Sequence, residues 1–272
     1  MKRMIIFLLT ITIALSGCNS VPQEIKDSVD TEKLKEAVDT EKLKDAVVDI
    51  VVDKLEEQEQ VMILKEYYEY IQQRASEDKI LNFLKENIKG LDEKRVDEML
   101  IQLENHLSVK GYDTKGILEK VSPYLQYASD ELKSYFKLWD NEVNDQTTDG
   151  ESTIKPADEI LKRALDAEKH IQSFPEGKTR DRIEELYRTY LKMGIEGLGN
   201  QYIYAEEGEN KLSQEVQRIY EKIIADNPGS WTSKLLEDYL SELNKDSMNL
   251  DGPNAEYFFD NLDDIIDNIE RQ

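Results

Sequence analysis

The stretch DEKRVDEMLIQLENHLSVKG, residues 92–111, carries the pattern that decides the fold. Its apolar residues recur at intervals of three and four, namely Val96, Met99, Leu100, Leu103 and Leu107. That spacing places them on one face of an α-helix, with charged residues on the opposite face. Asp92 can cap the start of this helix, and Gly111 can end it. The stretch therefore predicts an amphipathic helix that needs partners to cover its apolar face.

The same period continues along most of the chain, between turn signals. Ser76 and Asp113 can each cap a further helix, Pro123 predicts a kink or a restart, and Pro156 suits a first helical turn. No convincing run of strands occurs. We therefore expect an all-α protein, an irregular multi-helix bundle of about nine amphipathic helices. A tetratricopeptide-type solenoid is disfavoured because no motif recurs every ~34 residues.

Two features divide the chain in sequence. Residues 29–37 and 38–46 repeat one another at eight of nine positions (VDTEKLKEA and VDTEKLKDA), which favours a solvated stalk, with a repeated binding epitope as the alternative. Residues 144–153 (NDQTTDGEST) contain no apolar side chain and predict a polar linker loop. We expect a tether and stalk over 18–46 and helical subdomains over 47–143 and 154–272.

Composition excludes several kinds of site. The formal charge of −23 disfavours nucleic acid as a partner, because phosphate backbones would be repelled. One cysteine and two histidines exclude a disulfide framework and a three-histidine zinc site. Asp145, Thr147, Asp149 and Gly150 imitate the start of a calcium loop, but Pro156 stands where a bidentate glutamate is needed. We predict no metal site, no cofactor and no catalytic residue.

The N-terminus reads as an export signal. Lys2 and Arg3 precede twelve uncharged residues, MIIFLLTITIAL, a segment too short to span a bilayer, which needs ~20 residues. Leu15 ends this segment and is followed by Ser16, Gly17 and Cys18, and these four positions resemble the lipobox of bacterial lipoprotein precursors. The alternative is an ordinary secretory signal followed by a chance cysteine.

The resemblance to lipoprotein precursors implies cleavage after Gly17, removal of residues 1–17 as the signal peptide and a diacylglyceryl group on Cys18. The only thiol of the chain lies where this modification needs it. Removing Lys2 and Arg3 with the signal peptide leaves a formal charge of −25, so we expect the body to stand off anionic headgroups. The expected location is the cell membrane, on its extracytoplasmic face, with the protein anchored by its lipid.

Residues 194–208 (GIEGLGNQYIYAEEG) depart from the helical period. They hold four of the twelve glycines of the chain, and Tyr202 and Tyr204 flank Ile203. Glycine relaxes the backbone and tyrosine offers amphipathic contact surface, so we predict that Tyr202, Tyr204 or both are exposed partner contacts. The alternative is an ordinary connection between helices, in which glycine permits close packing.

These features together favour a binding or scaffolding module with a protein partner at the cell envelope. An enzyme that acts on glycan through acidic residues is the alternative, and it would need a cleft with convergent carboxylates. A solute-binding lipoprotein is disfavoured because two-lobed solute receptors need strand runs.

Overall fold

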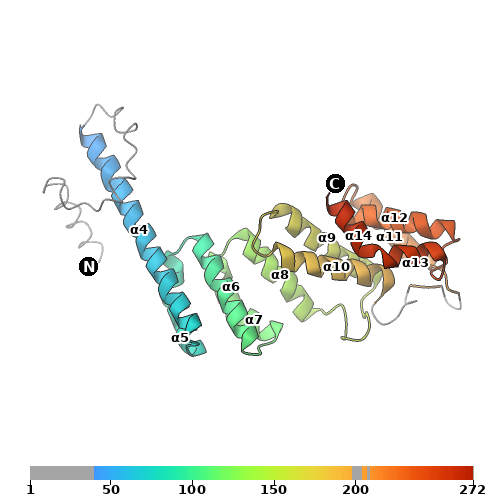
Figure 1. The fold of residues 1–272 in the computed structure, drawn as a ribbon, viewed down its shortest axis with the longest axis horizontal. Coiled ribbons are helices and arrows are strands. Elements are labelled where there is room, and N and C mark those ends of the chain that lie inside the picture. The colour runs from blue at the N-terminus through green and yellow to red at the C-terminus, as the bar shows by residue number, and fades with distance from the viewer. Residues whose placement is uncertain (1–39, 198–203, 207–208, 272) are drawn as a thin grey trace. The chain divides into compact units, whose positions relative to one another are not determined.

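The computed structural model describes residues 40–197, 204–206 and 209–271, and it confirms the all-α class (Figure 1). These residues form eleven α-helices, labelled α4 to α14, and two short 3₁₀ helices, η1 and η2. The same residues contain no strand, only isolated bridges such as the one that pairs Thr148 with Thr153. The helix count exceeds the expected nine partly because Asn261 interrupts the last predicted helix.

Contacts divide the chain into two units, with the boundary after Leu91. The described part of the first unit contains α4 (Thr40–Gln72), α5 (Glu77–Asn87) and η1 (Ile88–Gly90). Tyr67 is fully buried there, with its ring stacked 6.2 Å from the ring of Phe83. Of the predicted stalk, residues 40–46 belong to α4, and residues 18–39 lie outside the described part of the chain.

The second unit contains the remaining helices. These are α6 (Glu93–Val109), α7 (Thr114–Val121), η2 (Ser122–Tyr127), α8 (Asp130–Asn144), α9 (Ala157–Ser173), α10 (Arg180–Glu196), α11 (Gln214–Asp226), α12 (Trp231–Lys245), α13 (Pro253–Asp260) and α14 (Leu262–Glu270). The helices α9 and α10 form a closely packed pair (Figure 1). Gly194 permits their approach, because a Cβ there would lie 2.6 Å from Cδ2 of Leu161.

Several helix starts agree with the sequence. Asp92 accepts a hydrogen bond from the backbone N–H of Arg95, and Asp113 accepts one from Gly116, so these two predicted caps are confirmed. Ser76 occupies the N-cap position of α5 but makes no side-chain capping hydrogen bond. Pro123 lies in η2, and the chain then restarts as α8 after Ser129. The Ser129 hydroxyl accepts from the N–H of Leu132 and caps that helix.

Three carboxylates, of which two are buried and that of Glu131 is half-buried, bond to the start of a helix other than their own, and we call them the cross-helix caps. Asp97 on α6 accepts the N–H of Ser129, 2.9 Å away. Glu131 on α8 accepts the N–H and hydroxyl of Thr179, at 2.8 and 2.7 Å. Glu168 on α9 accepts the N–H groups of Trp231 and Thr232, at 2.7 and 3.0 Å. A negative charge at a helix N-terminus is stabilising. Because each carboxylate belongs to a different helix from the one that it caps, these contacts hold neighbouring helices together.

The polar segment 144–153 joins α8 to α9 inside the second unit. The boundary between the two contact units falls after Leu91 and not in this segment. Both flanking helices hold the start of the loop. Thr147 bonds to Glu142 on α8, and Asp145 bonds to Arg163 on α9.

Candidate functional site

A cleft of about 540 Å³ lies in the second unit, among α6, α7, α8 and α10. Its lining is largely apolar, and the main apolar contributors are Ile117, Leu118, Phe136, Trp139, Leu186 and Met193. Polar side chains complete the lining, namely Glu104, Asn105, Tyr135, Glu142, Arg182 and Glu185, with Ser108, Thr114, Thr147, Thr148, Thr189 and Tyr190. Volume and lining are both in the range typical of ligand sites.

Arg182 organises one polar group of the cleft. Its guanidinium donates to Glu104 at 2.6 Å and to the Tyr135 hydroxyl at 3.0 Å, and its second terminal nitrogen donates to Asn105 at 2.8 Å. The Tyr135 hydroxyl in turn donates to Glu104 at 2.6 Å. Burial raises the pKa of Tyr135 well above its ordinary value, so the phenol stays a donor. The group joins α6, α8 and α10.

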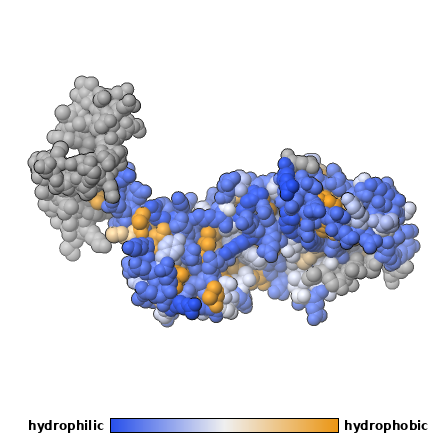
Figure 2. Space-filling model, viewed as in Figure 1, coloured by the Kyte–Doolittle hydropathy of each residue, from blue (hydrophilic) through white to orange (hydrophobic). Residues whose placement is uncertain are grey.

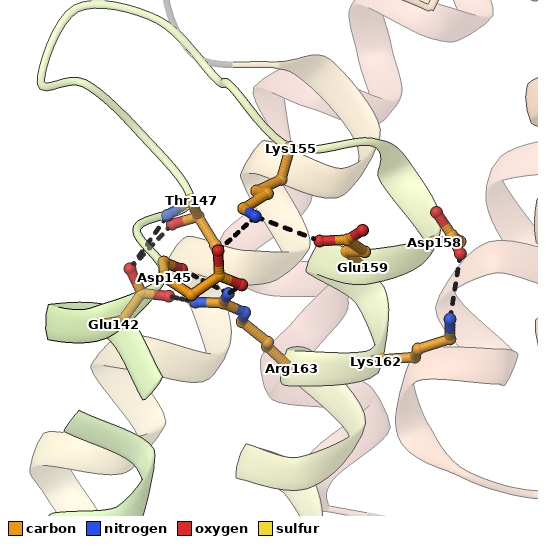
Figure 3. Close-up of polar contacts among 8 residues, drawn as sticks. All are labelled: Glu142, Asp145, Thr147, Lys155, Asp158, Glu159, Lys162 and Arg163. Atoms are coloured by element: carbon orange, nitrogen blue, oxygen red, sulfur yellow. Dashed lines mark hydrogen bonds and ion pairs between the residues drawn. The ribbon is translucent and has the colours of Figure 1, made fainter. Parts of the chain in front are cut away.

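Glu142 organises the second polar group. Its carboxylate accepts from the Tyr190 hydroxyl at 2.8 Å, from the Thr147 hydroxyl at 3.0 Å and from Arg163. Figure 3 shows the guanidinium of Arg163 between Glu142 and Asp145. The hydrogen bond from Lys155 lowers the pKa of Asp145, and Arg163 adds to that effect. The group fixes the start of the polar loop against α9.

Trp139 stands out among the lining residues. Its ring lines the cleft and also a smaller hollow of about 360 Å³, which Asp113, Lys115 and Gln146 help to form. Its indole N–H is buried and has no hydrogen-bond partner in the described part of the chain. The ring of Tyr135 lies 6.4 Å away and contacts Phe136 edge-on at 4.9 Å, so three aromatic rings gather on α8. In the sequence, Trp139 follows Tyr135 and Phe136 at helical spacing, and that spacing carries no sign of a cleft.

Tyr204 is not exposed, and the prediction of an exposed ring at this position is wrong. Its side chain is 6 % exposed, and its hydroxyl donates to the backbone oxygen of Met193 at 3.0 Å. Burial raises its pKa to about 12. The Tyr220 hydroxyl bonds to the next carbonyl, that of Gly194, at 2.8 Å. The Met193 carbonyl also accepts the backbone N–H of Gly197 at 3.1 Å, so the two phenols add side-chain hydrogen bonds to the last turn of α10. Tyr202 lies outside the described residues, and its role as a partner contact stays a prediction.

His170 is buried between two hydroxyls. Its Nδ1 lies 2.9 Å from Ser134 Oγ, and its Nε2 lies 3.0 Å from Thr179 Oγ1. Because the Thr179 hydroxyl donates to Glu131, it accepts from Nε2, which leaves Nδ1 to accept from Ser134. Neither Ser134 nor His170 lines the cleft. The arrangement joins the starts of α8 and α10 and the end of α9.

In the calcium-like loop, the carboxylate oxygens are occupied by hydrogen bonds and ion pairs within the protein. Asp149 accepts the backbone N–H groups of Glu151 and Ser152, which lowers its pKa, and Asp145 pairs with Lys155 and Arg163. Across the ranges that the structure describes, no three His, Cys, Asp or Glu side chains converge as metal ligands.

Comparison with known families bears on the N-terminus. Residues 1–19 match the family model described as the prokaryotic membrane lipoprotein lipid attachment site. The chain carries a lipoprotein attachment site. The lipobox at Leu15 to Cys18 is thereby confirmed, and it implies a membrane-anchored lipoprotein. No curated protein and no solved structure matches the chain. Among the described helices of this lipoprotein, none is long and apolar enough to cross a membrane.

Proposed function

We propose that this membrane-anchored lipoprotein is a binding module of the cell envelope, exposed on the extracytoplasmic face of the membrane, and that the cleft of its second unit holds its partner. The observation that carries the proposal is the cleft itself, a largely apolar hollow with three clustered aromatic rings and polar side chains in its lining. Tyr135 and Phe136 are already buried, whereas the half-buried ring of Trp139 remains for a partner to cover. Aromatic anchors that become desolvated dominate the free energy of many interfaces.

The rigidity of the cleft supports binding. Its polar groups tie α6, α8 and α10 together through Arg182 and Glu104, and they tie α8 to α9 through Arg163. A preformed site loses little conformational entropy when it binds, which favours affinity. An enzyme acting on glycan would need two carboxyl groups free to face the substrate. Glu104 and Glu142 are instead held by arginine and tyrosine side chains within the protein.

The test is site-specific photocrosslinking of the full-length lipoprotein in native membranes. A photoreactive phenylalanine analogue replaces Thr189, an exposed residue of the cleft on α10, and in a matched variant it replaces Lys169, an exposed residue of α9 outside the cleft. We expect a discrete adduct from position 189 and none of the same mass from position 169.

A blocking variant makes the test specific to the cleft. Ser108 is exposed on α6 and lines the same cleft, so Ser108→Trp adds bulk there without opening the core. It should abolish the adduct from position 189. An adduct that persists with the blocked cleft, or equal adducts from both positions, would contradict the proposal.

A further inference from the structure

The charges of the cleft differ in whether they already have partners. Arg182 donates to Glu104, Tyr135 and Asn105, so its positive charge is balanced inside the protein. Glu142 is balanced by Arg163. Glu185 is different, because it is exposed on α10 and its carboxylate makes no ion pair or hydrogen bond with the described residues. The lining therefore offers one unbalanced charge, and that charge is negative.

The aromatic rings that line the same cleft as Glu185 suit a cation as well. The guanidinium of Arg182 already lies over the ring of Tyr135, 5.9 Å from its centroid. The protein thus uses one aromatic face of this cleft to hold a cation. Trp139 presents a larger ring in the same lining, and tryptophan gives the strongest attraction of this kind.

The net charge of the whole chain also favours a cationic partner. The whole chain has a formal charge of −23, and the face seen in Figure 2 is mostly hydrophilic over the described residues. An acidic body attracts cationic partners and repels anionic ones during diffusional encounter. Lys115 lines the smaller hollow together with Asp113 and does not line the cleft.

Resting on the proposed function, we infer that the cleft recognises a segment of a partner protein that carries arginine or lysine beside apolar side chains. The apolar side chains pack on Phe136, Leu186 and Met193. The cationic group lies against Trp139 and pairs with Glu185. Neutral apolar and acidic segments fit the same volume but leave Glu185 unpaired or repelled.

The test uses three synthetic peptides in which leucine alternates with arginine, with serine or with glutamate. Trp231→Phe leaves Trp139 as the only tryptophan of the full-length, detergent-solubilised lipoprotein, so the emission of Trp139 reports occupation of the cleft. The arginine peptide should shift this emission and bind tightest, the serine peptide should bind more weakly, and the glutamate peptide should not bind.

A matched pair of variants distinguishes binding in the cleft from attraction to the acidic surface as a whole. Glu185→Gln and Glu256→Gln remove the same charge, and Glu256 is an exposed residue of α13 that makes no ion pair with the described residues. Glu185→Gln should weaken the arginine peptide about five-fold, the size expected of one rim ion pair, and leave the serine peptide unchanged. Glu256→Gln should change neither.

Equal weakening by both variants would overturn the inference, because it would assign binding to the acidic body as a whole. So would equal binding of all three peptides. The proposed function fails separately, when the photoreactive group at position 189 gives no adduct that Ser108→Trp suppresses. If the adduct forms but the peptides show no preference for arginine, the proposed binding function stands and the cationic partner is rejected.

Discussion

Arg163 on α9 forms two ion pairs, and its burial sets it apart from the neighbouring lysine. Its side chain is 11 % exposed, and it pairs with Glu142 and Asp145 across the start of the polar loop. The neighbouring Lys162 pairs with Asp158 at 3.0 Å, but its side chain is 66 % exposed. Figure 3 shows both basic residues on α9, with Arg163 paired to Glu142 of α8 and Lys162 paired to Asp158 of α9. They therefore form an internal comparison between a buried ion pair and a solvated one.

We predict that Arg163→Met lowers the free energy of unfolding by about 3 kcal/mol, because Glu142 keeps its partly buried charge and loses its counter-ion. Lys162→Met should change it by less than about 0.5 kcal/mol. Urea denaturation followed by circular dichroism measures both. Equal effects of the two substitutions would show that burial does not distinguish these pairs.

His170 should make stability depend on mildly acidic pH. Burial lowers its pKa below the ordinary value, while Glu131 opposes this shift. In the unfolded chain the imidazole takes up a proton near pH ~6.5, whereas the folded protein holds it neutral to lower pH. The unfolded state thus binds more protons below that pH, and stability falls as pH falls, by at most about 1.4 kcal/mol per pH unit.

The measurement compares the wild type with His170→Gln at pH 7.5 and 5.5, a window above most carboxylate titrations. The variant loses hydrogen bonds at both pH values, so the informative quantity is the difference between the two pH values. That difference should be smaller in the variant. An unchanged difference would mean that other groups cause the acid sensitivity.

At the scale of the element, the cross-helix caps decide how helices meet. Glu168 is buried and accepts three hydrogen bonds from Trp231 and Thr232 at the start of α12. We predict that Glu168→Gln costs about 1–2 kcal/mol, because the amide keeps the volume but loses the charge and one acceptor. Glu159→Gln, at a half-exposed carboxylate 3.5 Å from Lys155, should cost less than about 0.5 kcal/mol. Thermal denaturation of both variants tests the comparison, and a similar loss in each would contradict it.

The helices and their starts could be predicted from sequence because their causes are local. Asp92 caps α6 through Arg95, only three residues away. The cleft could not be predicted, since its contacts join distant positions. Arg163 is 21 residues from Glu142, and Arg182 is 78 residues from Glu104. A 3.6-residue period identifies an apolar face without identifying the helix that covers it.

Tyr204 illustrates the same limit for loops. Its glycine-rich surroundings correctly indicated a break in the helix, because α10 ends at Glu196 and Gly197 has a φ of +73°. The same surroundings gave no information about burial, which depends on contacts such as the hydrogen bond from the Tyr204 hydroxyl to the backbone oxygen of Met193, eleven residues earlier. Turn chemistry is a property of neighbours in sequence, whereas burial is a property of neighbours in space.

At the scale of the whole molecule, one thiol decides the attachment to the membrane. We predict that Cys18→Ala abolishes lipid attachment and leaves the precursor uncleaved, because Cys18 supplies the only sulfur nucleophile of the chain. Incorporation of radiolabelled palmitate and the mass of the chain measure the two steps. Label in the variant, or a wild-type protein that fractionates as fully soluble, would contradict the assignment.

The buried tyrosines have a spectroscopic consequence. The fully buried side chains include Tyr135, Tyr187, Tyr190, Tyr220 and Tyr239, and burial raises the pKa of all five phenols. In denaturant all fourteen tyrosines should ionise together near pH ~10. In the native protein the buried phenols stay protonated to higher pH. Their contribution to the free energy of unfolding is therefore fully present below pH ~10 and is lost as the pH rises further. Their phenolate absorbance should then appear in one step with the loss of helical dichroism, and the tyrosines would record alkaline unfolding without any added dye.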